Sequence, residues 1–374
     1  MCISNAVRVI VLIFCAGLGT VASAAPVTLR VITTMNRYYG PIGAVEESPG
    51  VFYFATNGSG VFSITTSGTK TFLTAFQNGY LIESPLVSGW DGRLYSMVQH
   101  TVQTANAFSV AGTQGRVIYG SQNYVASFTQ NLPDGSLLGV GASTQTFQQC
   151  LVRSDLQGVV APFYQFPSGD RLPLSVTYGR DGNYYGVAYV EDGSGFVYMV
   201  TPTGSLTQVY NFPVGTFGLQ TQVGVPIVQA SDGNLYGTTP NGGANGTGTI
   251  YKLTPAGKYT LLYTFPENKT SFPAELIEGS DGNLYGATSG LIAGGGYSLL
   301  FRITPSGQYT VLHAMNFLSE GGCPCPLTQG SDGSIYGTAP SGGSTGGGTV
   351  FALDAGLPKP APQPLRFQPE SGPV

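Results

Sequence analysis

Charged residues are scarce in this sequence of 374 residues, and their scarcity limits the partners that it can have. Lysine, arginine, aspartate and glutamate together make up 9% of the chain, and the formal net charge is −4. No stretch concentrates charge of one sign, which argues against a nucleic-acid-binding surface and against a coiled coil. The chain is instead rich in glycine (55 residues) and tyrosine (22 residues), as expected of an all-β protein with many turns.

Long apolar stretches are also missing after the first 24 residues. Arg8 gives a short basic start, an apolar run follows from Val9 to Leu18, and Ala22-Ser23-Ala24 has the small residues of a cleavage site. The run is shorter than the roughly 20 residues of a membrane-spanning helix. We therefore expect residues 1–24 to be a signal peptide and the mature protein to be secreted or periplasmic, with no membrane span after cleavage.

Cysteine and histidine are too few to suggest a metal site. Three cysteines remain after residue 24, Cys150, Cys323 and Cys325, and an odd number in an exported protein leaves at least one thiol or intermolecular bond unexplained. The only histidines, His100 and His313, do not form a ligand-like spacing with Cys323-Pro324-Cys325. We expect no metal and no cofactor, and either a disulfide or unpaired loop cysteines.

One phrase, Ser-Asp-Gly-Asn-Leu-Tyr-Gly, organises the rest of the chain. It occurs at residues 231–237 and 280–286, and with small changes at 331–337. Periods of about 40 to 50 residues, built from short strands and turns, are typical of the blades of a β-propeller. Looser copies begin at Asp181, Asp134 and Asp91, and a degenerate seventh copy is Pro49-Gly50-Val51-Phe52-Tyr53.

A second turn, Thr-Pro-x-Gly, recurs at residues 201–204, 254–257 and 304–307. Four short strands are predicted around the two turns of blade five, at residues 225–230, 234–239, 249–253 and 259–265. The last blade lacks a fourth strand because Pro358 and Pro360 interrupt it, and residues 27–32 form a strand without a blade.

These features predict an all-β, seven-bladed β-propeller over residues 25–356, closed by its N-terminal strand. Closure in this way would remove two open sheet edges. Residues 357–374 are predicted to be a proline-rich, extended tail, whose end is similar to the start of an immunoglobulin-like IPT/TIG module.

The predicted topology places the short turns on one side of the ring and the long, irregular connections on the other. Binding usually resides in variable loops on a rigid scaffold, although such loops also serve merely to close blades. We expect a non-enzymatic binding or scaffold module, a monomer, that uses the long-loop side for an extracellular glycan or protein. A purely structural role stays open.

Residues 231–265 resemble the GloVer tandem repeat of exported bacterial proteins. The similarity rests on Ser-Asp-Gly-Asn-Leu-Tyr-Gly-Thr-Thr, the glycine-rich loop after it and Thr-Ile-Tyr-Lys-Leu-Thr-Pro-x-Gly. Blades five to seven match closely and blades one to four loosely. The resemblance implies a propeller-like fold and export, and it implies no catalytic residue.

Acidic residues give the alternative hypothesis, a propeller hydrolase or lyase that acts on a polysaccharide or lactone. Paired carboxylates on the first strands would serve as acid and base. The candidates are Glu46, Glu47, Glu83, Glu275 and Glu278. The turn aspartates are expected to shape turns rather than bind calcium, because each turn supplies only one. They are Asp91, Asp134, Asp181, Asp232, Asp281 and Asp332.

Aromatic residues and histidines have simpler explanations than a site. Trp90 and the many tyrosines would suit a carbohydrate platform, but the tyrosine of Leu-Tyr-Gly recurs at one blade position, which indicates packing between blades. His100 and His313 have no adjacent nucleophile motif and are expected to be core or surface residues.

Overall fold

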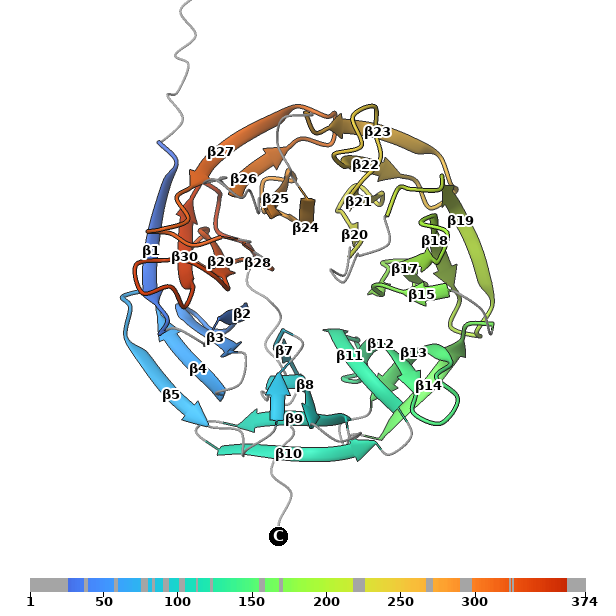
Figure 1. Cartoon of the computed structure of the whole chain (residues 1–374), viewed down its shortest axis with the longest axis horizontal. Helices are drawn as coiled ribbons and strands as arrows, with labels where there is room; N and C mark the ends of the chain where they lie inside the picture. The colour runs from blue at the N-terminus through green and yellow to red at the C-terminus, as the bar shows by residue number, and fades with distance from the viewer. Residues whose placement is uncertain are drawn as a thin grey trace, which may run out of the picture.

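The computed structural model arranges the chain as a ring of small antiparallel sheets (Figure 1). In the described part of the chain every regular element is a β-strand, and no helix is long and apolar enough to cross a membrane. The prediction of an all-β propeller arrangement is therefore confirmed. The structure describes residues 26–36, 40–56, 60–74, 80–82, 85–89, 94–100, 105–111, 114–121, 124–154, 159–167, 171–217, 226–266, 272–289, 298–322, 324 and 326–361.

The described strands form seven sheets, which we number in chain order. Sheet 1 contains β2 (Pro41–Ser48), β3 (Val51–Thr56), β4 (Gly60–Thr65) and β5 (Lys70–Thr74). Sheet 2 contains β6 (Tyr80–Ile82), β7 (Val87–Ser88), β8 (Leu94–His100), β9 (Ala105–Ala111) and β10 (Gln114–Ser121). Sheet 3 contains β11 (Tyr124–Asn131), β12 (Leu137–Ser143), β13 (Gln149–Ser154) and β14 (Val160–Gln165).

The second half of the ring repeats this plan. Sheet 4 contains β15 (Arg171–Pro173), β16 (Thr177–Tyr178), β17 (Tyr184–Val190), β18 (Gly195–Val200) and β19 (Leu206–Phe212). Sheet 5 contains β20 (Val228–Gln229), β21 (Leu235–Thr239), β22 (Thr249–Leu253) and β23 (Tyr259–Thr264). Sheet 6 contains β24 (Phe272–Glu278), β25 (Leu284–Ser289), β26 (Ser298–Ile303) and β27 (Tyr309–Met315). Sheet 7 contains β28 (Leu327–Gln329), β29 (Ile335–Ala339), β30 (Thr349–Asp354) and β1 (Thr28–Thr34).

The N-terminal strand lies where the sequence predicts it. β1 pairs antiparallel with β30, from Thr28 opposite Asp354 to Thr34 opposite Thr349. It therefore takes the outermost place in a sheet whose other strands come from the end of the chain (Figure 1). The signal peptide predicted at residues 1–24 lies outside the described residues.

The core lies between neighbouring sheets rather than in one centre. Tyr185 of sheet 4 shares a buried cluster with Leu235 of sheet 5, and Tyr236 of sheet 5 shares another with Phe301 of sheet 6. Burying one such aromatic side chain contributes about 2 to 3 kcal/mol, so each junction between sheets is a substantial source of stability. The recurring tyrosine is thus a packing residue, as predicted.

The glycine after that tyrosine has a packing reason as well. Gly237 lies opposite Tyr251 in the pairing of β21 with β22, and a Cβ at Gly237 would be 2.4 Å from the Tyr251 hydroxyl. Gly337 stands in the same relation to Phe351, at 2.4 Å from the ring. An aromatic residue on the third strand therefore crosses over the second strand, where only glycine leaves room.

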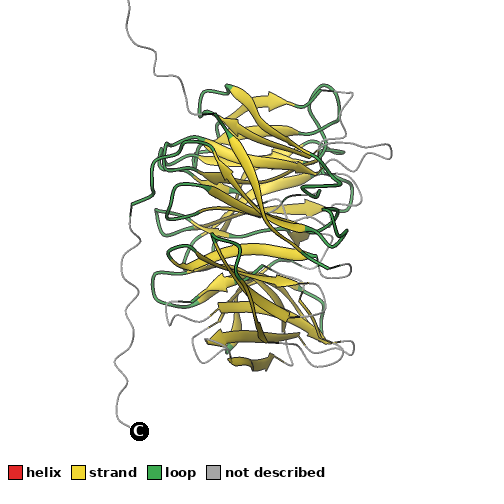
Figure 2. Cartoon of the chain, turned by 90° about the vertical axis from the view of Figure 1, so that its left-hand side faces the viewer, coloured by secondary structure: helices red, strands yellow, loops and turns green. Residues whose placement is uncertain are grey.

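The strand order sorts the connections between two faces of the ring (Figure 2). We call "turn face" the one that carries the turns from first to second and from third to fourth strand. We call "loop face" the one that carries the connections from second to third strand and from one sheet to the next. This division follows from antiparallel pairing within each sheet.

The chain continues past its last strand along the turn face. Leu357 packs against the cluster between sheets 6 and 7, and the Pro358 carbonyl accepts hydrogen bonds from Ser280 Oγ (2.5 Å) and Gln329 Nε2 (3.1 Å). Residues 362–374 lie outside the described part, so the IPT/TIG-like start and the domain boundary at residue 356 stay predictions.

Candidate functional site

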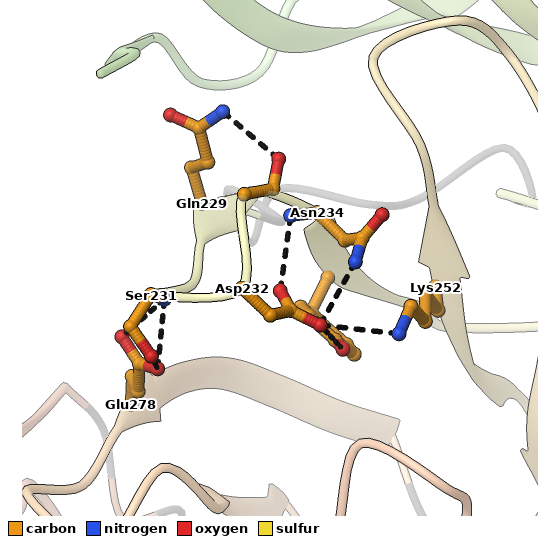
Figure 3. A network of polar contacts seen from close by, with 8 residues as sticks. Gln229, Ser231, Asp232, Asn234, Lys252 and Glu278 are labelled. Atoms are coloured by element: carbon orange, nitrogen blue, oxygen red, sulfur yellow. Dashed lines mark hydrogen bonds and ion pairs between the residues drawn. The ribbon is translucent and has the colours of Figure 1, made fainter.

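Each clear turn of the repeated phrase is held by one aspartate. Asp232 Oδ1 accepts from the backbone N–H of Asn234 (3.0 Å), and Asp232 Oδ2 accepts from Asn234 Nδ2 (2.8 Å) and from the Tyr236 hydroxyl (2.8 Å). Lys252 Nζ adds a contact of 3.1 Å to the same oxygen (Figure 3). Gly233, between Asp232 and Asn234, has a φ of +81°, which glycine adopts without strain.

These contacts also determine the charge of the turn. Burial alone would raise the pKa of Asp232, but the hydrogen bonds from Asn234, Tyr236 and Lys252 outweigh burial and lower the pKa to about 2. The carboxylate is therefore ionised at any physiological pH and fully engaged by its own sheet.

The same arrangement recurs in other sheets. Tyr185, Tyr285 and Tyr336 donate to the aspartate four residues earlier, at 2.7 to 2.9 Å. The aspartates at 134, 181, 281 and 332 each accept from the backbone N–H two residues on. The prediction that these aspartates shape turns is confirmed for five of the six, and Asp91 lies outside the described residues.

A second set of polar contacts joins neighbouring sheets. Both carboxylate oxygens of Glu278 lie 2.8 Å from the backbone N of Ser231, one sheet earlier, and Ser231 Oγ also donates to Glu278 (Figure 3). Gln329 likewise accepts from the backbone N of Ser280, and its Nε2 donates to Ser280 Oγ. Gln229 accepts from the backbone N of Arg180. All three residues lie three positions before the turn aspartate of their own sheet. We call this contact the junction clamp.

The junction clamp also joins sheet 1 to sheet 7. Glu46 accepts from the backbone N of Ser331 (2.6 Å) and from Ser331 Oγ (2.8 Å). Phe52 of sheet 1 stacks on Tyr336 of sheet 7 with ring centroids 3.8 Å apart. Sheets 1 and 7 therefore contact each other through the same kind of hydrogen bond that joins consecutive sheets. Glu47 is also engaged, because Ser88 of sheet 2 donates to it.

The predicted acid and base are consequently not brought together as free carboxylates in the described part of the chain. Glu46, Glu47 and Glu278 accept hydrogen bonds from adjacent sheets, and Glu83 lies outside the described residues. Glu275 is different, because its side chain forms no hydrogen bond with another described residue and part of its surface stays open to solvent. Burial raises its pKa to about 7.

The loop face differs from the turn face in its exposed side chains. Phe147 is 77% exposed, Leu318 76% and Val214 68%, and all three lie on loop-face connections. Leu172, at the loop-face end of β15, and Phe317 are also exposed. On the turn face the described residues include one comparable side chain, Val159.

Backbone hydrogen bonds hold these loop-face residues in place. Gly215, next to Val214, donates to the carbonyl of Gly193, and Asn241 of the following glycine-rich loop donates to Thr216. Gly343, in the glycine-rich loop of sheet 7, donates to the carbonyl of Phe317. The exposed side chains therefore project from fixed backbone.

His313 helps to anchor the connection that carries Phe317 and Leu318. Its Nε2 lies 2.9 Å from Glu320 Oε2, which also accepts from the backbone N of Asn316. The Glu320 carbonyl accepts from Thr349 Oγ1. His313 is thus a surface residue of an outer strand with a structural partner, as the sequence predicts.

The remaining candidates give no site. Cys150 is a buried, free thiol, and burial raises its pKa to about 11. Trp90, Cys323, Cys325 and the His100 side chain lie outside what the structure describes. Among the described residues, no group of three histidines, cysteines, aspartates or glutamates is placed to hold a metal ion.

The sequence belongs to a known repeat family. The model of the Gloeobacter/Verrucomicrobia repeat matches residues 171–358, which is half of the chain and covers β15 to β30. This chain is therefore a member of the family, which is the GloVer repeat that its sequence resembles. No curated protein matches the sequence.

Solved structures share the fold at low identity. An inactive variant of virginiamycin B lyase from Staphylococcus aureus, with quinupristin, superposes with a TM-score of 0.62 at 15% identity, over 87% of this chain and 99% of that one. YCF48 bound to a D1 peptide gives 0.54 at 13%, over 90% and 99%. The extracellular domain of a putative two-component system from B. thetaiotaomicron gives 0.55 at 14%, over 87% and 41%. At such identities the similarity concerns the fold alone.

The junction clamp is the element that sequence reasoning missed. Its signal is a glutamine or glutamate three residues before the turn aspartate, present as Gln229, Glu278 and Gln329. Glu46 has the same place relative to Pro49 of the degenerate copy. A recurring polar residue at one repeat position indicates a contact that every repeat makes.

Proposed function

We propose that this protein is an exported binding module that takes a protein segment on its loop face, carried by one closed ring of seven blades. In this proposal each sheet is a blade, and β1 completes the last one. The pairing of β1 with β30 and the junction clamp between Glu46 and Ser331 support closure. The signal-peptide pattern of residues 1–24 supports export.

The distribution of exposed apolar side chains carries the proposal. Large exposed apolar residues cost solubility, and a group of them on one face of a soluble protein indicates an interaction site. Of nine such residues in the described part of the chain, five lie on the loop face and one on the turn face. The loop-face residues are Phe147, Leu172, Val214, Phe317 and Leu318.

An apolar protein segment suits this face better than a glycan does. Three of the five residues are aliphatic, and sugar rings stack on aromatic rather than aliphatic side chains. The backbone hydrogen bonds at Gly215 and Gly343 fix the loops beforehand, which reduces the entropy lost on binding.

The engaged glutamates speak against the enzymatic alternative. A glycosidase-like mechanism needs two carboxyl groups that are free to meet a substrate. Glu46 and Glu278 instead accept hydrogen bonds from serines of the preceding sheet.

Peptide selection tests the proposal. A random peptide display library is selected on the full-length protein, and the enriched peptides are titrated onto Val214→Asp and Leu318→Asp, with Val159→Asp as the control on the turn face. We expect binding to weaken at least about tenfold in the two loop-face variants and to persist in the control. Selection of no peptide, or loss of binding in the control alone, would contradict a protein ligand on the loop face.

A further inference from the structure

One repeat position forms an inner ring of residues around the centre of the molecule. It lies six residues before the turn aspartate, on or just before the innermost strand of each sheet (Figure 1). Sheet 3 departs from the others because a β-bulge adds a residue between Phe128 and Gln130. In the other sheets the position holds Gly43, Pro85, Ser175, Pro226, Glu275 and Pro326.

These positions are neighbours around the ring. A Cβ on Gly43 of sheet 1 would lie 2.9 Å from Pro85 Cβ of sheet 2 and 3.1 Å from Pro326 Cγ of sheet 7. The innermost strand of sheet 6, β24, likewise contacts β20 of sheet 5 and β28 of sheet 7. By the repeat, Glu275 therefore occupies the place between Pro226 and Pro326.

The backbone at Glu275 is fixed by the preceding sheet. β24 has a β-bulge between Pro273 and Leu276, and the Ala274 carbonyl in this bulge accepts from Thr238 Oγ1 at 3.1 Å. Thr238 is 1% exposed, so the contact is shielded from water. Leu276, the next residue, is buried between sheets 5 and 6, whereas Glu275 keeps part of its surface open.

Among the residues that the structure describes, those at the equivalent places around the ring give Glu275 no compensating charge. The equivalent residues are glycine, serine and three prolines, and a proline has no backbone N–H to donate. Two residues further along the innermost strands the side chains are again uncharged, as in Val228, Ile277 and Thr328. A carboxylate placed among such residues lacks a donor.

This environment selects one type of ligand. A divalent cation prefers six or more oxygen ligands, and one carboxylate supplies at most two. An anion would be repelled. An ammonium group carries three donors, no acceptor and a compact positive charge, and its alkyl stem packs against apolar residues.

We propose that the centre of the ring binds a primary ammonium group, which donates hydrogen bonds to the Glu275 carboxylate while its alkyl stem contacts the neighbouring prolines. This site deepens the proposed function. The ammonium belongs to a lysine side chain of the protein segment bound at the loop face, and this part of the inference rests on the proposed function.

Binding of n-butylamine hydrochloride to the full-length protein tests the site. Melting temperatures are compared at pH 8 with sodium chloride at the same ionic strength, for the wild type, for Glu275→Gln and for Glu191→Gln. Glu191 is exposed in the loop-face turn between β17 and β18, so its variant removes the same charge outside the ring centre. We expect the amine to raise the melting temperature by about 2 °C in the wild type and in Glu191→Gln, and to leave Glu275→Gln unchanged. An equal rise in all three proteins, or none in the wild type, would overturn the site.

Three further ligands distinguish the sources of the ammonium. A short peptide with one lysine is compared with the same peptide carrying acetyl-lysine, and with glucosamine. Tighter binding of the lysine peptide supports a protein source, and tighter binding of glucosamine overturns it.

A loop-face variant separates this inference from the proposed function. Leu318→Asp is expected to bind n-butylamine as the wild type does, because Leu318 is exposed on the connection from β27 to β28 and is not a residue of an innermost strand. If this variant also keeps full affinity for selected peptides, the loop-face proposal fails while the ammonium site stands.

Discussion

The two faces of the ring are built on different plans. On the turn face, sheets 4 to 7 repeat the same aspartate-to-tyrosine contact, and Glu46, Glu278 and Gln329 repeat the same contact to a serine of the sheet before. On the loop face the exposed apolar residues described above are of different types and mostly occupy different positions of the repeat. Val214 and Phe317 are the exception, because each lies two residues after the end of an outermost strand, β19 or β27. The contacts that hold the sheets together thus recur from sheet to sheet, whereas the exposed apolar side chains that are available to a partner differ between sheets.

The loop face nevertheless has its own order. The glycine-rich loops of sheets 5 and 7 share a backbone pattern, in which Gly248 donates to Gly242 and Gly348 donates to Gly342. Each also bonds to the connection before it, at Thr216 or Phe317. Variation on this face therefore concerns side chains more than backbone.

The largest expected effect comes from removing a turn aspartate. Asp232→Ala removes the carboxylate that accepts hydrogen bonds from Asn234, Tyr236 and Lys252. The Tyr236 hydroxyl then loses its acceptor. We expect the free energy of unfolding to fall by about 3 kcal/mol, as measured by urea unfolding. Asp192→Ala is the control, because Asp192 accepts from the backbone N–H of Ser194 in a loop-face turn, and the nearby Tyr189 hydroxyl donates to the Glu191 carbonyl rather than to the aspartate. An equal loss in both variants would abolish the contrast between the faces.

A glycine of the loop face gives a smaller effect. Gly243 has a φ of +73°, and a Cβ there would lie 2.8 Å from methyl groups of Thr249 and Thr264. Gly243→Ala is expected to cost about 2 to 3 kcal/mol, through backbone strain and this overlap. Gly246→Ala shares the positive φ (+66°) but meets open space, so about 1 kcal/mol is expected. Equal costs in thermal unfolding would show that the loop backbone is not held as described.

Glu275 makes stability depend on pH. Its pKa is raised from 4.5 to about 7 in the folded protein, so the unfolded chain loses this proton at a lower pH than the folded one. The stabilisation is present below pH 4.5 and is lost as the pH rises through 7. Glu275→Gln should therefore match the wild type at pH 4 and exceed it at pH 8 by about 1 to 2 kcal/mol, allowing for partial exposure. A difference that is the same at both pH values would show that Glu275 does not titrate near 7.

The smallest expected effect is on the loop face. Val214→Ser changes a side chain that is 68% exposed, so the free energy of unfolding should change by less than about 0.5 kcal/mol. The same variant is expected to weaken the binding of selected peptides. A large loss of stability in urea unfolding would mean that Val214 is part of the structure and not of a binding surface.

The sequence predicts those features that depend on local spacing. The turns at Asp232 and Asp281, the strands on either side of them and the missing fourth strand of the last sheet follow from turn residues and from prolines. The sequence also predicts that the strand at residues 27–32 pairs with the last sheet, because this strand has no sheet of its own and the last sheet lacks a fourth strand.

The polar contacts between sheets were not predicted from the same sequence. Glu278 and Glu46 were candidates for catalysis. Only the arrangement of neighbouring sheets brings Glu278 to a serine 47 residues away in sequence and Glu46 to one 285 residues away. The isolation of Glu275 likewise depends on which residues of other sheets lie beside it. Such neighbours are separated by 40 residues or more, and no local pattern encodes their distance.

The most direct test of the account compares two junction clamps by urea unfolding. Glu278→Ala opens the clamp between two consecutive sheets, and Glu46→Ala opens the corresponding clamp between the first and the last sheet. The account predicts one cooperative transition in both variants, with similar losses of about 2 kcal/mol, because one contact closes both junctions. If Glu46→Ala keeps the free energy of unfolding of the wild type while Glu278→Ala clearly loses stability, the closed ring is contradicted.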